Sequence, residues 1–257
     1  MTRFKKMKQR LEALLLPPAW PEDAKSIPED AAAVTGMEAV SPLLALLPRG
    51  GLLKWRAVIL LGRVTAALAA GSSQDSPHNS MPGSMEDART VMRRCMWHLN
   101  EDSGNMGWGI AEAMGEIAAK SPLLAREYGR VILSYARDTG FADNFIDHAA
   151  LRRGAYWAIG RFAPRYPAYR GEAAELLLAG LRDEDGQSRG IAAWGLGNLA
   201  AAGSFPDAGA REKVKAALAG VGNQDPCEVL EGLHCRVEPA VSFARQALNR
   251  LEDRGGG

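Results

Sequence analysis

Apolar side chains recur at fixed offsets from four glycines along the chain. The glycines are Gly62, Gly115, Gly160 and Gly197. Apolar residues occupy positions −5, −1 and +2 relative to each glycine, and a small or apolar residue occupies position −2. These offsets are the i, i+3, i+4, i+7 signature of one helical face. The pattern therefore predicts an array of similar helices, each with a small residue where a neighbouring helix approaches closely.

The four glycines recur at intervals of about 37 to 53 residues, a period that on helices indicates an α-solenoid. Asn249 takes the glycine position in a fifth, weaker copy. Sustained period-2 alternation is missing from the sequence, so no sheet is expected. The sequence predicts an all-α fold, an α-solenoid superhelix of about five helix pairs.

Three segments are expected along the chain. Residues 1–36 read as an amphipathic helix with a Pro-rich connector, residues 37–252 as the repeat array with a mobile loop at about 71–85, and residues 253–257 as a disordered tail. The basic N-terminal helix, over residues 2–16, fits a cap on the first repeat. The alternative, a helix lying on a membrane surface, stays open.

Composition narrows the class of partner. Thirty-one basic and 30 acidic residues leave a net charge of +1, so no global charge drives binding to nucleic acid or membrane. The three cysteines form no disulfide framework, and no apolar run reaches the length of a membrane span, so a cytoplasmic protein is expected. Cys227, His234 and Cys235 lack the paired spacing of zinc ligands, and neither a metal nor another cofactor is predicted.

Two segments carry a resemblance to a known kind of repeat. Arg189–Leu199 and Arg153–Phe162 approximate the form Arg-x-x-Ala-x-x-Ala-x-Gly-x-Leu. They resemble HEAT-like repeats of the phycobilisome-lyase type, and the resemblance covers roughly residues 39–251. The long turns after Leu99 and Gly140 also resemble an uncharacterised bacterial family of HEAT-repeat proteins. The resemblance implies HEAT-like helix pairs, and it fits scaffolds, lyases and accessory proteins alike.

A second stripe follows each second helix on the side away from its apolar face. Its members lie at i, i+4 and i+8 and are expected to be exposed. This second-helix stripe combines tryptophan with charged and amide side chains, the composition of a binding hot spot. The expected groove residues are Trp108, Glu112, Glu116, Arg153, Trp157, Arg161, Trp194 and Asn198. The competing interpretation is that the indoles pack against the next repeat.

The turns that lead into the second helices are polar and are expected at one end of the array. The rim residues are Asn105, Asp147, His148, Arg152, Gln187, Arg189, Glu231 and His234. Several turn residues are explained equally well as helix N-caps, above all Asp185 and Ser188. Asp147, His148 and Arg152 could together perform acid–base chemistry. No nucleophile elbow, phosphate loop or zinc-protease helix accompanies them, and no catalytic residue is assigned.

These patterns favour a scaffold that binds a partner protein or peptide in the concave groove. A lyase-like or accessory enzyme that acts on a bound cofactor is the alternative, suggested by the resemblance and the aromatic groove. A nucleic-acid-binding array is a third possibility, which the near-zero net charge and the acidic pair Glu112 and Glu116 oppose. The sequence does not fix an oligomeric state.

Overall fold

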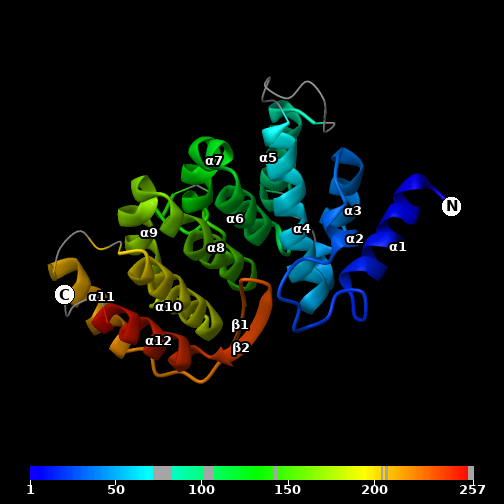
Figure 1. Cartoon of the computed structure of the whole chain (residues 1–257). Helices are drawn as coiled ribbons and strands as arrows, with labels where there is room; N and C mark the ends of the chain where they lie inside the picture. The colour runs from blue at the N-terminus through cyan, green and yellow to red at the C-terminus, as the bar shows by residue number, and fades with distance from the viewer. Residues whose placement is uncertain (72–82, 101–106, 142–143, 204, 206–207, 254–257) are drawn as a thin grey trace. The chain divides into compact units, whose positions relative to one another are not determined.

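The structure is a computed structural model that describes residues 1–71, 83–100, 107–141, 144–203, 205 and 208–253 (Figure 1). The chain divides into two compact units. One comprises Met1–Tyr128 and Leu230–Cys235, and the other comprises Gly129–Val229 and Arg236–Gly257. Among the described helices, none combines the length and the apolar character needed to cross a membrane.

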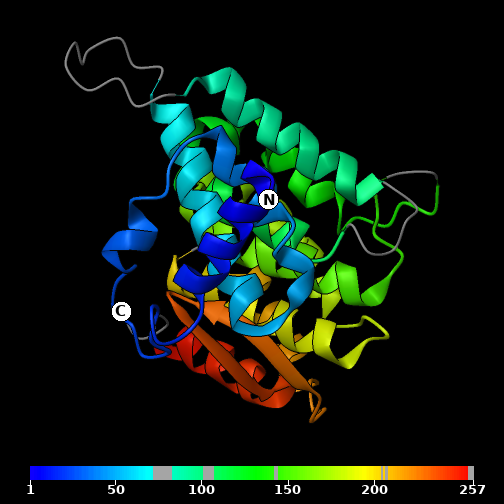
Figure 2. The same cartoon turned by 90° about the vertical axis from the view of Figure 1, so that its right-hand side faces the viewer.

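The first unit is built on α4 (Gly51–Ala70), against which α5 (Met85–Asn100) and α6 (Ile110–Lys120) pack (Figure 2). Side chains on nearly all sides of α4 are buried, as expected for a helix that is surrounded by neighbours. The elements that precede α4 are α1 (Arg3–Leu15), α2 (Glu29–Ala32), η1 (Met37–Ala39), α3 (Val40–Leu44) and η2 (Leu47–Arg49). The helix α7 (Pro122–Ser134) begins in this unit and ends in the other.

Gly62 shows why a glycine recurs in the array. A methyl group on its Cα would lie 2.5 Å from Cγ of Glu116, which lies on α6. A larger residue at this position would therefore force Glu116 to shift. The aliphatic part of Glu116 fills the space that the missing side chain leaves.

A buried arginine ties the N-terminal segment to α4. The guanidinium of Arg56 donates to the carbonyl oxygen of Leu15 at 2.9 Å and to that of Pro21 at 3.1 Å. Its cationic carbon also lies 5.3 Å from the ring centre of Trp20. The residues that end α1 and follow it are thus held by one side chain from another helix.

The second unit repeats the helix-pair arrangement. It contains α8 (Ala149–Phe162), η3 (Ala163–Arg165), α9 (Pro167–Gly180), α10 (Gly186–Ala201), α11 (Ala208–Ala219) and α12 (Ala240–Asp253). The strands β1 (Pro226–Glu231) and β2 (His234–Pro239) belong to it only in part, because Leu230–Cys235 is assigned to the first unit. The helix α10 packs against α8, α9 and α12. A methyl group at Gly160 on α8 would lie 2.6 Å from Cα of Gly195 on α10. Small residues on both helices therefore bring their backbones together.

The all-α repeat fold predicted from the glycine pattern is confirmed, with one correction. The expectation that no sheet forms is wrong at 226–239, where β1 and β2 form a two-stranded hairpin. Gly232 has a φ of 66°, the left-handed conformation that a tight hairpin turn requires. The sequence reading treated this segment as a polar turn because each strand is only 6 residues long.

Several sequence expectations fall on residues outside the described part. The predicted mobile loop at 71–85 overlaps the undescribed residues 72–82, and most of the predicted tail at 253–257 is also undescribed. The N-terminal helix is present as α1, with Leu11 and Leu15 buried. The assignment of 37–252 to a single array stays a prediction.

Candidate functional site

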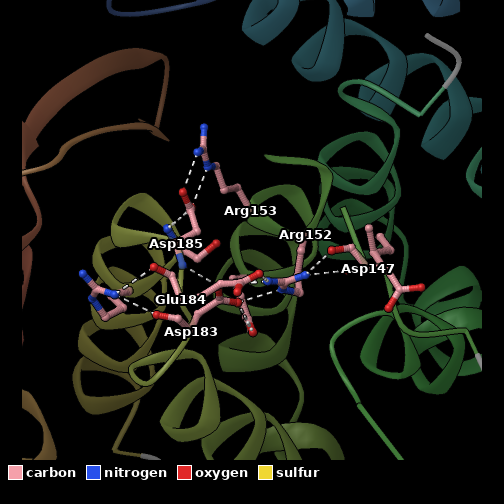
Figure 3. Close-up of polar contacts among 10 residues, drawn as sticks. Asp147, Arg152, Arg153, Asp183, Glu184 and Asp185 are labelled. Atoms are coloured by element: carbon pink, nitrogen blue, oxygen red, sulfur yellow. Dashed lines mark hydrogen bonds and ion pairs between the residues drawn. The ribbon is translucent and has the colours of Figure 1, made fainter. Parts of the chain in front are cut away.

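Arg152 on α8 organises the turn between α9 and α10 in the second unit (Figure 3). Its guanidinium makes a bidentate pair with the carboxylate of Asp183, with nitrogen–oxygen distances of 2.7 and 2.9 Å. The same guanidinium donates to the main-chain oxygens of Ile146 and Asp147, and the hydroxyl of Tyr156 donates to Asp183 at 3.0 Å. These bonds compensate the charge of a buried arginine.

Arg153 makes a second bidentate pair one residue further along. Its nitrogens lie 2.8 and 2.6 Å from the two carboxylate oxygens of Asp185. Asp185 is also the N-cap of α10 and accepts a bond from the amide of Ser188 at 2.8 Å. Arg189 closes the turn by donating to the main-chain oxygen of Asp183 at 2.8 Å. The predicted capping role of Asp185 is confirmed.

These contacts set the charge state of both aspartates. Burial alone would raise the pKa of Asp185, but the bonds from Arg153 and Ser188 outweigh it and lower the pKa from 3.8 to about 2. The pKa of Asp183 is lowered in the same way, because bonds from Arg152 outweigh the effect of burial. Both carboxylates are ionised at neutral pH, and the turn is an ion-paired clamp between α8 and α10.

The structure does not assemble Asp147, His148 and Arg152 as an acid–base set. Arg152 bonds to the main-chain oxygen of Asp147, whose carboxylate points away from the guanidinium (Figure 3). His148 is exposed and occupies the N-cap position of α8. The cluster that the sequence suggested is therefore a helix-end contact, and Arg152 is committed to Asp183.

The two tryptophans of the stripe in the second unit are buried. Trp157 is 1% exposed and Trp194 is 4% exposed, and their rings stack at 5.9 Å with an angle of 5°. The amide of Asn198 donates to the main-chain oxygen of Gly160 at 3.3 Å and accepts from Arg250 at 2.8 Å. The expectation that this stripe is exposed is wrong for both indoles, because packing between α8 and α10 covers them. Their role in binding stays a prediction.

The stripe in the first unit is a row of acid–lysine contacts. Lys54 lies 3.5 Å from Glu112 and 3.8 Å from the ring centre of Trp55. Glu116 is 1% exposed and pairs with Lys120 at 3.2 Å. Each glutamate thus has a lysine partner within its own unit. The repulsion expected between two carboxylates one turn apart is offset locally.

The other predicted residues are more accessible. Half-buried members of the stripe are Trp108, Arg153, Arg161 and Asn198. In the rim, Gln187 and Glu231 are half-buried and His234 is exposed, whereas Asn105 lies outside the described residues. Cys227 is buried, and burial raises the pKa of its thiol to about 12, so the thiol stays protonated at neutral pH.

Sequence reasoning missed an exposed tryptophan in the first unit. Trp97 on α5 is 54% exposed, while Val91, Met92 and Cys95 on the other side of the helix are buried. An open cavity of about 390 Å³ adjoins it, lined by Thr90, Arg93, Arg94, Trp97 and His98. We call these five residues the α5 face. A tryptophan on the polar side of an amphipathic helix was the available signal.

A second cavity lies next to the α5 face. Its volume is about 240 Å³ and its lining is Arg3, Phe4, Met7, Met37, Glu38, Ser41 and Pro42. We call it the α1 cavity. The guanidinium of Arg94 donates to the hydroxyl of Ser41 at 3.1 Å, so one bond connects the linings of the two cavities. Phe4, in the lining of the α1 cavity, is 43% exposed.

The features above define an all-α protein made of consecutive helix pairs. No protein-family model matches the chain, and no curated protein matches it in sequence. Similar solved structures include an engineered protein, 16% identical, with a TM-score of 0.46 over 99% of this chain and 98% of that chain. A designed armadillo repeat protein is 16% identical, with a TM-score of 0.44 over 96% and 99% of the two chains.

A third similar structure is of computationally designed armadillo repeat proteins for modular peptide recognition. It is 15% identical, with a TM-score of 0.39 over 96% of this chain and 99% of that chain. At these TM-scores the likeness defines neither a family nor a ligand.

Proposed function

We propose that the chain is an interaction scaffold that binds a partner protein or peptide. The observation that carries the proposal is the exposed indole of Trp97 in the lining of a cavity of about 390 Å³, beside two arginines. Tryptophan and arginine dominate the hot spots of protein interfaces, where they fill pockets on the partner. With 54% of its surface exposed, the side chain of Trp97 is available for contact with another molecule.

The second-helix stripe enters the proposal as a second contact surface. In the second unit its half-buried members Arg161 and Asn198 provide cationic and amide groups for a partner. The buried indoles of Trp157 and Trp194 act as a rigid support beneath the groups in the second unit. Rigid support matters because binding then costs less side-chain entropy.

A photo-crosslinking amino acid at position 97 tests the scaffold proposal. The matched control places the same group at Leu123, which is 51% exposed on α7 in the same unit. We expect a stoichiometric protein or peptide to be captured from position 97 and not from position 123. The captured partner, purified separately, should bind the unmodified chain in calorimetry.

Two other results would replace the proposal. A coloured or tightly held small molecule in the purified protein, seen by absorbance, would favour a lyase-like or accessory enzyme. Co-purifying nucleic acid, seen by absorbance near 260 nm, would favour a nucleic-acid-binding array. If no partner is captured from position 97 or from position 123, the result would contradict the scaffold function.

A further inference from the structure

We infer that the α5 face docks an acidic peptide segment whose apolar side chain packs on Trp97. The inference rests on the proposed scaffold function and specifies the chemistry of its partner. Every residue that carries it lies in the first unit.

The α5 face is one continuous side of a helix. Thr90, Arg93, Arg94, Trp97 and His98 are spaced at i, i+3, i+4, i+7 and i+8, so they line up along a single helical face. The buried positions Ala88, Val91, Met92 and Cys95 turn toward the core of the unit. The α5 face consequently points away from that core.

Trp97 provides the apolar contact. Its ring meets the ring of His98 edge-on, with centroids 5.3 Å apart and an angle of 66°. This contact orients the indole while 54% of the residue remains exposed. An apolar side chain in the adjoining cavity of about 390 Å³ would cover this exposed surface.

Arg94 provides a positive charge with a neutral partner. Its guanidinium bonds to the hydroxyl of Ser41 at 3.1 Å, which leaves the charge uncompensated by that contact. A guanidinium has five N–H donors, so a second bond to a carboxylate is available without breaking the first. Through this bond the α5 face contacts the lining of the α1 cavity.

Arg93 provides a second positive charge that is weakly held. It pairs with Glu86 at 2.6 Å, but the two side chains are 51% and 63% exposed. Exposed pairs of this kind contribute little, so a carboxylate from a partner can replace Glu86. Arg89, by comparison, is bound bidentately to Glu127 at 2.9 and 2.7 Å and is not part of the docking surface.

The sign of the charge selects the partner. The lining of the α5 face contains two arginines and no carboxylate, so it attracts an anion. Favourable interaction with the negative C-terminal end of α5 explains basic residues near that end without a ligand. It does not explain an exposed indole between them. An acidic peptide with an apolar anchor accounts for both features.

Selection from a random-peptide display library tests the inference on the full chain. We expect the enriched peptides to share carboxylates next to an aromatic or aliphatic residue. A synthetic peptide of the enriched sequence should bind with an affinity that falls as salt rises. Trp97→Ala and Arg94→Glu should each weaken binding by at least about tenfold, a change readily measured by calorimetry.

Matched controls separate docking from folding. Leu123→Ala removes an exposed apolar side chain of the same unit, and Arg182→Glu makes the same charge reversal at an exposed position. Both controls should change the affinity by less than about twofold. Thermal melts of all four variants should stay close to that of the parent chain, because the substituted side chains are not in the core.

The outcomes distinguish the two proposals. Enriched peptides that are neutral or basic, or that bind Trp97→Ala and Arg94→Glu as well as the parent, would overturn the docking inference and leave the scaffold function standing. Tight binding of a single-stranded oligonucleotide or self-association through this face would also overturn it. No enrichment, together with no capture at position 97, would overturn both.

Discussion

Asp185 serves two helices with one carboxylate. It caps the first turn of α10 through the amide of Ser188 and pairs with the guanidinium of Arg153 on α8. Both contacts favour the ionised form, so the pKa of Asp185 falls to about 2 although burial opposes ionisation. The junction between α8 and α10 is therefore sensitive to acid.

The first prediction concerns the pH dependence of stability. The folded pKa of Asp185 lies below its ordinary value of 3.8, so its contribution is present above that value and is lost as pH falls toward about 2. Asp185→Asn keeps a good N-cap residue but removes the charge. Melting temperatures measured across this range should fall less steeply for Asp185→Asn than for the parent. If the melting temperatures of the parent and of Asp185→Asn fall equally steeply with pH, the ion pair of Arg153 with Asp185 contributes nothing to stability.

The second prediction contrasts two tryptophans. Trp157 is 1% exposed and stacked on Trp194, so Trp157→Ala should lower the free energy of unfolding by about 3–5 kcal/mol. Trp97 is 54% exposed, and Trp97→Ala should cost less than about 1 kcal/mol. Urea titration of both variants measures the difference. Equal losses would contradict the assignment of Trp157 to the core and Trp97 to the surface.

At the scale of elements, close approach of helices explains the glycine pattern. Gly160 faces Gly195, and a methyl group at Gly160 would lie 2.6 Å from the backbone of that residue. Gly171 on α9 is different, because a methyl group there would meet nothing within 4 Å. Gly160 and Gly171 both lie within helices but differ in their surroundings, so they form a matched pair for substitution.

The third prediction uses this pair. Gly160→Ala should destabilise the protein by about 1–3 kcal/mol, because overpacking against the backbone of α10 outweighs the better helix propensity of alanine. Gly171→Ala should stabilise it by up to about 1 kcal/mol, because only the propensity changes. Chemical denaturation of both variants provides the values. Opposite signs are expected, and a stabilising Gly160→Ala would contradict the close approach.

The sequence predicts the helix pairs because their signal is periodic. Gly62 and Gly160 each stand among apolar residues at helical spacing, and that pattern survives without tertiary information. The burial of Trp157 could not be read in the same way. It lies off the apolar face, but α10 is rich in alanine and glycine and packs closely enough to cover it. Contacts between elements, not periodicity, decide such positions.

The β1–β2 hairpin and the ion pairs between α8 and the start of α10 could not be predicted from the sequence for a related reason. Strands as short as β1 and β2 give too few residues for alternation to stand out from an irregular turn. The pairs of Arg152 with Asp183 and Arg153 with Asp185 join residues that are about 30 positions apart. Side chains of opposite charge at that separation are common, and only the packing of α8 against α10 selects these partners.

At the scale of the whole chain, the division into two units predicts that a substitution destabilises mainly the unit in which it lies. In helical arrays each repeat gains most of its stability from its nearest neighbours. The fourth prediction is that Gly160→Ala accelerates amide hydrogen exchange mainly within residues 129–229 and 236–253 and leaves residues 1–128 close to the parent. Hydrogen-exchange mass spectrometry measures both regions. A uniform increase over the chain would show a single cooperative unit.

Arg56 makes the N-terminal attachment tolerant of sequence change. Its guanidinium binds the main-chain oxygens of Leu15 and Pro21, and a carbonyl oxygen is present whatever the side chain. The exposed residue at position 21 can therefore be substituted, or accept a grafted peptide or label, as long as the side chain of Arg56 is retained. For protein engineering, position 21 is a permissive insertion point, because the side chain that anchors this segment belongs to Arg56 on α4.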